Sequence, residues 1–207
     1  MSEHVLKLDP PAFGPDRNFL PDAVYSEDVV MILSDGSERA QAVADAFASV
    51  GAAIVAVGPD MSSAKRITGI AAGYGGKTMA ASWDSPVAPV FDEVNDRVGA
   101  VDHLISIDVE EKTVSLYLQT LANAPPVAPR KRSCVFVSKP GGMATRLEQL
   151  AGEVRLNAVE VDLGVGANGP VGRAGGLFEL GWAVAFLCSP YAREMDGQLL
   201  RLDGGAS

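Results

Sequence analysis

Short, wholly apolar runs alternate with amphipathic helical patterns along most of this chain, and this alternation is what most constrains its fold. Val29–Leu33 has the composition of a strand that is buried on both faces. Apolar residues then recur at helical spacing from Ala40 to Val50, and Gly51 is a typical helix stop. A second apolar run at 53–57 completes a strand-helix-strand unit within about 30 residues. This unit indicates a parallel sheet.

The same alternation continues to the end of the chain. Further strands are predicted at 78–82, 102–107, 133–137, 156–161 and 199–202. Further helices are predicted at 63–72, 87–98, 143–154 and 177–188. One more helix is predicted between Asp108, which can cap its start, and Pro125, which ends it. Strands that alternate with helices in this way predict an α/β fold with an open, doubly wound parallel sheet. We therefore predict a single domain over residues 29–207.

Residues 1–28 differ from the rest because prolines interrupt them at Pro10, Pro11, Pro15 and Pro21. Proline fixes φ and lacks an N–H donor, so this stretch cannot form a regular helix or a central strand. We predict a proline-rich N-terminal arm. It lies over the domain, reaches a neighbouring subunit, or is a partly disordered tail.

Composition and charge argue against several classes of function. The chain is 47% hydrophobic and 21% charged, which is typical of a globular protein, and its net charge of −9 disfavours nucleic acid and membrane as partners. It has no apolar run of about 18 residues and no signal-peptide pattern, so we expect a cytoplasmic protein. Cys134 and Cys188 lie in apolar runs, which favours buried thiols. His4 and His103 lack metal-ligand spacing, so no metal site is predicted.

Several segments resemble the short-chain dehydrogenase/reductase family. The most specific are PVGRAGGLFELGWAVAFLCS (170–189) and DGQLLRLDGG (196–205), which resemble that family's stretch from its substrate loop through its last helix to its last strand. VRLNAVEVDLG (154–164) resembles its sixth strand, and GAVDHLI (99–105) the entry to its fourth. The resemblance implies a Rossmann-type fold, in which the family binds a nicotinamide dinucleotide and transfers a hydride.

The glycines with which that family holds its dinucleotide are replaced here. Its G-x-x-x-G-x-G motif falls on Ser34, Glu38 and Ala40, where glycine would allow the pyrophosphate to approach the helix N-terminus. A carboxylate at Glu38 would repel a phosphate about 4 Å away by roughly 4 kcal/mol, unless it is an ordinary helix-start acid that points away. The family's ribose-binding acid falls on Gly58. Asp60 could substitute for it, although Asp60 is also typical of a turn.

The family's catalytic positions are changed as well. Its Asn-Asn-Ala-Gly motif falls on residues 106–109, and none of the four is retained. Its proton-transfer device is a serine after the fifth strand and a Tyr-x-x-x-Lys on the next helix. Ser138 either matches that serine or is a turn residue, and the following segment, 139–156, is about half the family's length, so that helix is shortened. No tyrosine follows the fifth strand at the matching place, the four being Tyr25, Tyr74, Tyr117 and Tyr191.

These losses predict a degenerate member of the family, with no catalytic residue and no bound cofactor. The favoured function is a non-catalytic subunit that pairs with a catalytically intact, NAD(P)-dependent relative, or with a second copy of itself. The segment from Leu177 through Gly205 is predicted to form the contact, because it keeps the family's sequence at one of its two usual interfaces.

Two alternatives remain open at this point. An enzyme of altered chemistry would use Asp108, Glu110, Glu111 and Ser138, which follow strands at the edge where α/β sheets place their sites. Asp108 and Glu110 also suit an ordinary helix start. A stand-alone ligand-binding or regulatory module would instead use the vacated crevice.

Overall fold

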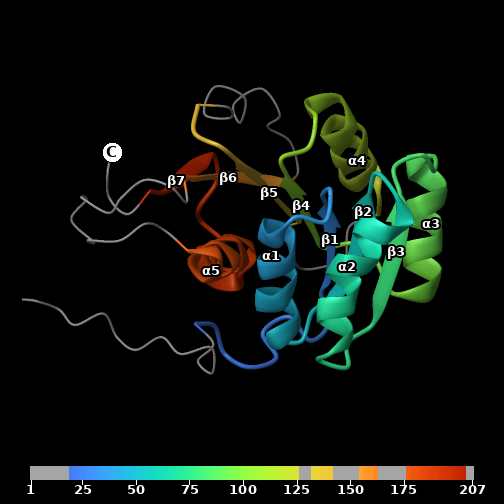
Figure 1. Cartoon of the computed structure of the whole chain (residues 1–207), viewed down its shortest axis with the longest axis horizontal. Coiled ribbons are helices and arrows are strands. Elements are labelled where there is room, and N and C mark those ends of the chain that lie inside the picture. The colour runs from blue at the N-terminus through green and yellow to red at the C-terminus, as the bar shows by residue number, and fades with distance from the viewer. Residues whose placement is uncertain (1–18, 126–131, 142–153, 163–175, 204–207) are drawn as a thin grey trace, which may run out of the picture.

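A computed structural model describes residues 19–125, 132–141, 154–162 and 176–203 of the chain. Its sheet has seven parallel strands in the order β3-β2-β1-β4-β5-β6-β7 (Figure 1). The doubly wound α/β fold predicted from the sequence is confirmed. The strands are β1 (Val29–Leu33), β2 (Ala53–Gly58), β3 (Thr78–Ser82), β4 (His103–Ile107), β5 (Ser133–Ser138), β6 (Arg155–Val161) and β7 (Gln198–Leu202).

Helices cover both faces of this sheet. One face packs against α1 (Glu38–Ser49), α2 (Met61–Ala72) and α5 (Leu177–Cys188), and the other against α3 (Val87–Arg97) and α4 (Glu111–Asn123). A short 3-10 helix, Pro190–Ala192, follows α5. The central strand β1 is buried along its whole length, as its apolar composition requires. The shortened helix predicted at 143–154 lies outside the described residues, apart from Val154.

The closest helix contact is that of α1 with α5, and it depends on Gly181. A Cβ atom added at Gly181 would lie 2.5 Å from the carbonyl oxygen of Ala42 and 3.1 Å from the Cβ atom of Ala46. Real Cβ atoms do not approach backbone oxygens this closely. Glycine therefore lets α5 lie directly against the backbone of α1.

The described part of the predicted arm, residues 19–28, lies over the domain. Leu20 is buried and Tyr25 is fully buried, and the Tyr25 ring lies 4.9 Å from the ring of Phe47 in α1. The Tyr25 hydroxyl donates a hydrogen bond to the carbonyl of Ala185 in α5. The Phe19 ring lies 5.8 Å from that of Trp182. Residues 19–28 thus join α1 to α5.

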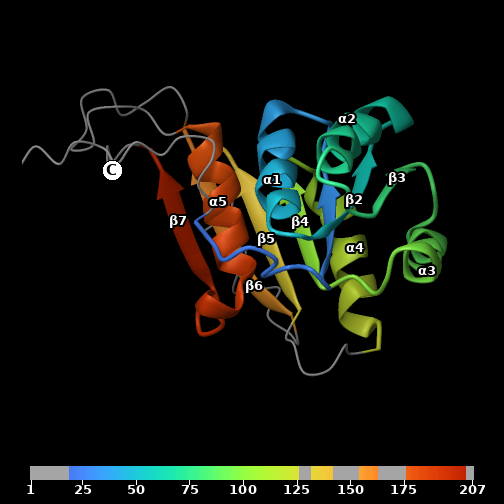
Figure 2. The same ribbon diagram turned by 90° about the horizontal axis from the view of Figure 1, so that it is seen from below.

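The last strand, β7, lies at one edge of the sheet, as the sequence predicted (Figure 2). It pairs with β6 along 198–202, and Leu200 and Leu202 are only partly buried. The thiols of Cys134 and Cys188 are both buried and free, which confirms that prediction. Among the described helices, none combines the length and apolar character needed to cross a membrane.

Candidate functional site

The candidate site lies at the carboxyl ends of β1 and β4, the place where folds of this type have their ligand crevice. These strands are neighbours in the sheet, but the connections from them run to opposite sides of it. Open α/β sheets bind their ligands outside the strand ends at such a switch point. The turn between β1 and α1 forms one wall of this crevice, and the segment between β4 and α4 forms the other.

An ion pair joins these two segments. Arg39, in the first turn of α1, donates from Nη1 to Oδ2 of Asp108, which follows β4, over 2.9 Å. Asp108 has a φ of +54°, an unfavourable region for a residue with a Cβ atom, and its N–H donates to the carbonyl of Val137 over 3.0 Å. The contact therefore holds the two walls together at the point where a ligand would enter.

This ion pair corrects the prediction that Asp108 caps the next helix. The helix α4 begins at Glu111, its N-cap residue is Glu110, and Glu110 makes no capping hydrogen bond through its side chain. Asp108 instead pairs with Arg39 of α1 and has a left-handed backbone conformation. Among the acids proposed for altered chemistry, Asp108 is therefore already paired with a cation.

The turn between β1 and α1 is fixed by contacts within the chain. Ser34 is fully buried, and its Oγ accepts a hydrogen bond from the N–H of Gly36 over 3.3 Å. Arg66, from α2, donates from Nη2 to the carbonyl of Asp35 over 3.0 Å and to the Oγ of Ser63 over 3.2 Å. Gly36 has a φ of +81°, and a Cβ atom there would lie 2.8 Å from the carbonyl oxygen of Ser63. The turn thus packs against α2, with Arg66 bonded across it.

Glu38 and Ala40 occupy the other two positions on which the family's glycine motif falls. Glu38 is the first residue of α1 and is exposed, so its carboxylate belongs to the helix N-terminus, where the helix dipole favours a negative charge. Ala40 is fully buried in the core. The helix therefore carries a negative charge of its own at the end that would face a pyrophosphate. Repulsion of a phosphate by Glu38 remains a prediction.

Gly58, at the end of β2 where the family has its ribose-binding acid, lies in a tightly packed place. A Cβ atom added there would lie 3.1 Å from both the carbonyl oxygen of Ser34 and the Cβ atom of Ser63. Asp60 is the N-cap residue of α2, and its Oδ1 accepts from the N–H of Ser63 over 2.8 Å. Hydrogen bonds from the Ser62 hydroxyl and the Ser63 amide lower the pKa of Asp60. The turn interpretation of Asp60 is confirmed.

Trp83 is a residue of this edge that the sequence did not point to. It follows β3, and its indole Nε1 donates to the carbonyl of Val57 in β2 over 3.1 Å, while its backbone N–H donates to the carbonyl of Gly58 over 2.8 Å. The indole ring is thereby held beside the carboxyl end of β2. Trp83, Arg66 and the Arg39–Asp108 pair follow one after another along this edge of the sheet.

Three of the four tyrosines have raised pKa values. Burial raises the pKa values of Tyr25 and Tyr117, and a hydrogen bond to Asp45 raises the pKa of Tyr74 to about 12. A catalytic phenol needs a lowered pKa instead. Tyr25, Tyr74 and Tyr191 lie in segments that lead into the amino ends of strands, opposite the crevice.

Ser138, the remaining candidate from the sequence, ends β5. Its hydroxyl donates to the carbonyl of its neighbour Lys139 over 3.1 Å, which is a local turn contact. Glu160, on β6, accepts from the N–H of Gly141 over 3.0 Å and pairs with Arg201 over 3.5 Å. Among the described residues, no group of three or more possible ligands could hold a metal ion.

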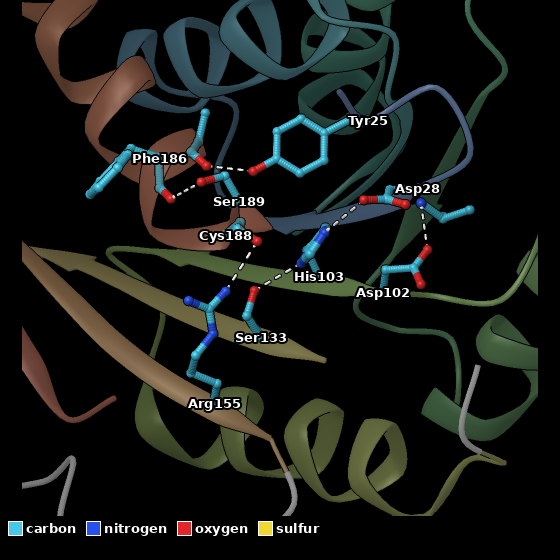
Figure 3. A network of polar contacts seen from close by, with 11 residues as sticks. Tyr25, Asp28, Asp102, His103, Ser133, Arg155, Phe186, Cys188 and Ser189 are labelled. Atoms are coloured by element: carbon cyan, nitrogen blue, oxygen red, sulfur yellow. Dashed lines mark hydrogen bonds and ion pairs between the residues drawn. The ribbon is translucent and has the colours of Figure 1, made fainter. Parts of the chain in front are cut away.

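A buried polar network lies at the opposite, amino edge of the sheet (Figure 3). The Oδ2 of Asp28 lies 3.3 Å from Nε2 of His103, and the Nδ1 of that ring lies 2.8 Å from the Oγ of Ser133. This order of groups is that of a nucleophilic triad. However, Ser133 is fully buried and the other two are 4% and 5% exposed, so no substrate reaches them. The network therefore joins strands rather than performing chemistry.

A buried arginine, Arg155, lies near this network. The guanidinium of Arg155 donates to the carbonyl of Cys188 (Figure 3) and to that of Ala192, and so stabilises the C-terminal end of α5. The sequence carried a signal for this edge: polar residues stand directly before or at the start of otherwise apolar strands, at Asp28, Asp102, Ser133 and Arg155.

Comparisons with known proteins agree with the fold. No family model and no curated protein matches the chain. Among solved structures, a citronellol catabolism dehydrogenase of Pseudomonas aeruginosa PAO1 has a TM-score of 0.72 at 20% identity, over 91% of this chain and 98% of that one. An enoyl-[acyl-carrier-protein] reductase (NADH) of Aquifex aeolicus VF5 has a TM-score of 0.71 at 16% identity, over 88% and 97%. A short-chain dehydrogenase/reductase described as a glucose/ribitol dehydrogenase, from Brucella melitensis, has a TM-score of 0.70 at 17% identity, over 89% and 98%. The chain therefore has the Rossmann-type fold of these oxidoreductases.

Proposed function

We propose that this protein is a non-catalytic subunit, derived from the short-chain dehydrogenase/reductase fold, that pairs with a catalytically intact, NAD(P)-dependent relative. The main support is that the family's glycine positions are occupied by Ser34, Glu38 and Ala40, and that an Arg39–Asp108 ion pair links α1 to the segment after β4, where such folds hold a dinucleotide. Arg66 and Trp83 are bonded along the same edge of the sheet. The chain's own side chains thus stand where a cofactor would be expected.

The missing proton donor supports the same proposal. A tyrosine and a lysine four residues later are needed to exchange a proton while hydride moves, and no tyrosine of the chain is followed by such a lysine. The dinucleotide-binding positions and the proton-donor positions are independent of each other, because they lie on opposite halves of the sheet. Loss of both, with the core intact, favours a retained structural role over a retained reaction.

The surface formed by α5 and β7 is the contact that we propose. The strand β7 exposes one edge, and an uncovered edge strand invites pairing or aggregation. Beside it, Phe186 and Tyr191 are 39% and 63% exposed. A two-fold contact would place α5 and β7 against the same elements of a related subunit and cover these groups. An interface of about 1,600 Å² or more is typical of a stable pair.

Sedimentation velocity, on the pure chain and on the chain co-expressed with an intact relative, tests this pairing. We expect a heteromeric species in the second sample, and at least about 100-fold weaker association for Leu200→Glu, because a charge would be buried without a partner at the contact. Leu116→Glu is the matched control: Leu116 is 49% exposed on α4, away from the proposed surface. A chain that stays monomeric in both samples, or equal effects of the two variants, would refute the pairing.

A further inference from the structure

A row of polar side chains crosses the amino end of the sheet, and the imidazole of His103 lies within it (Figure 3). In the register of the sheet, His103 of β4 pairs with Ser133 of β5, and Ser133 pairs with Arg155 of β6. These side chains, and that of Asp28 before β1, are buried. Ionisable groups are rarely buried unless they are paired, so the contacts of this row determine which charges the fold accepts here.

Both nitrogens of the His103 ring have partners. Nε2 lies 3.3 Å from Oδ2 of Asp28, and Nδ1 lies 2.8 Å from Oγ of Ser133. A carboxylate accepts, so Nε2 donates to Asp28, whereas a hydroxyl both donates and accepts. The neutral ring therefore accepts at Nδ1 from the Ser133 hydroxyl, and the protonated ring donates at Nδ1 to the same oxygen. Both charge states keep two hydrogen bonds, so the ring can gain or lose a proton in place.

Two buried carboxylates favour the protonated ring. Asp28 contacts Nε2 directly, and Asp102 is the residue before His103. Burial raises the pKa of Asp102, and the hydrogen bond from Val29 opposes this rise. The charges on His103 and Arg132 oppose it as well. Burial alone disfavours a charge on the imidazole, and these two carboxylates offset that effect.

The other groups around the ring differ in their effect on its charge. The guanidinium of Arg155 opposes protonation, but it donates to carbonyls at the end of α5 rather than to the ring. The phenol of Tyr25 stays neutral because burial raises its pKa, and Cys188 contributes a buried thiol. Toward the ring, β1 and α1 present the apolar side chains of Val30 and Phe47. The direct contact with a carboxylate therefore favours an added proton.

The contact at Nε2 lies where residues 19–28 join the sheet. The N–H of Asp28 donates to the carbonyl of Tyr25 over 2.9 Å, and its carbonyl accepts from the N–H of Ala53 in β2 over 3.0 Å. The Tyr25 ring stands edge-on to the His103 ring at 5.4 Å. Hydrogen bonds become shorter and stronger when their groups are ionised. Protonation of His103 would therefore strengthen the hold of the sheet on this segment through Asp28.

We propose that His103 is a proton-binding switch, which takes up a proton in place and thereby strengthens the attachment of residues 19–28 to the sheet. Histidine is the side chain whose charge ordinarily changes near neutral pH. The added attachment is present on the acidic side of the His103 titration and is lost as the pH rises through it. This inference rests on contacts within the fold and does not depend on the function proposed above.

An NMR pH titration of the full chain tests whether the ring titrates. The chain has two histidines, so two Cε1–Hε1 signals are expected, and a His4→Asn variant identifies that of His103. We expect the His103 signal to shift through a complete titration between about pH 5.5 and 8.5 while the protein stays folded. A His103 signal that does not move over this interval would overturn the proposal.

Amide hydrogen exchange tests the attachment. The N–H of Tyr25 donates to the carbonyl of Val50 over 3.1 Å, and that of Asp28 donates to the carbonyl of Tyr25. After correction for intrinsic exchange, we expect the protection of both amides to be at least about fivefold greater on the acidic side of the His103 titration. Equal protection on the two sides would contradict the proposal.

Asp28→Asn removes the charge of the carboxylate but keeps an oxygen acceptor of the same size. It should lower the midpoint of the His103 titration by about one pH unit or more, and abolish the difference in exchange. Asp96→Asn, which removes the same charge from the exposed surface of α3, should change neither. Equal midpoints in the parent and in Asp28→Asn would refute the proposal. If Asp28→Asn does not fold, the titration and the exchange of the parent chain decide.

Discussion

Replacing Gly181 with alanine is expected to lower the free energy of unfolding by roughly 3 kcal/mol, the upper part of the range for overpacked cores. The new Cβ atom would lie 2.5 Å from the carbonyl oxygen of Ala42, a backbone atom of α1 that cannot move aside as a side chain would. Alanine is the better helix former by about 1 kcal/mol, so the packing penalty must exceed that gain. Urea unfolding followed by circular dichroism measures the difference.

Gly69→Ala is the matched control, because Gly69 also lies within a helix, α2, but nothing stands within 4 Å of the position of its Cβ atom. We expect the free energy of unfolding of this variant to be about 0.5–1 kcal/mol higher than that of the parent. Opposite signs for the two substitutions would locate the effect in the contact between α1 and α5. A Gly181→Ala variant as stable as the parent would show that these helices do not pack as described.

Replacing Tyr25 with alanine is expected to lower the free energy of unfolding by about 3–5 kcal/mol, as for other large buried aromatic residues. Tyr25 is fully buried against Phe47, and its hydroxyl binds the Ala185 carbonyl. Tyr25→Phe should cost only about 1 kcal/mol, because the ring stays and Ala185 still accepts from the N–H of Ser189. Urea midpoints of the variants give these values.

Tyr191→Ala provides the comparison for an exposed tyrosine, since Tyr191 is 63% exposed, and a change within about 0.5 kcal/mol is expected there. If Tyr25→Ala unfolds at the same urea concentration as the parent, residues 19–28 are a dispensable attachment. The predicted loss of unfolding free energy in Tyr25→Ala would instead show that residues 19–28 are part of the core.

The elements of the fold follow from local patterns. Val29–Leu33 was predicted with the bounds that the structure has, because a strand covered by helices on both faces must be apolar along its length. The bounds of the edge strand Thr78–Ser82 were also predicted as the structure has them. The helix α2 begins at Met61, before the predicted residue 63, since Asp60 caps it. Caps depend on backbone geometry that composition alone does not set, which is also why Asp108 was misplaced.

The content of the crevice could not be predicted in the same way. Arg39 and Asp108 are 69 residues apart, and no local pattern links them. Arg66 and Trp83 likewise reach across from separate elements. Their contacts exist only because the sheet places β1, β2 and β4 side by side. The sequence showed which family residues were absent, and the fold showed what stands in their place.

The Arg39–Asp108 pair is not expected to act alone. It is partly exposed, and such pairs contribute at most about 1 kcal/mol, so removing it would not create a cofactor site. Ser34, Glu38 and Gly58 each differ from the residue with which the family binds its dinucleotide. Glu38→Gly alone should therefore not restore dinucleotide binding.

Isothermal titration calorimetry of the isolated chain with NADH and NADPH tests the central claim most directly. The Arg39–Asp108 ion pair, the charge at the start of α1 and the crowded end of β2 predict no measurable binding of either dinucleotide, and none by Glu38→Gly. A dissociation constant in the micromolar range for the unmodified chain would contradict the claim that this fold has given up its cofactor.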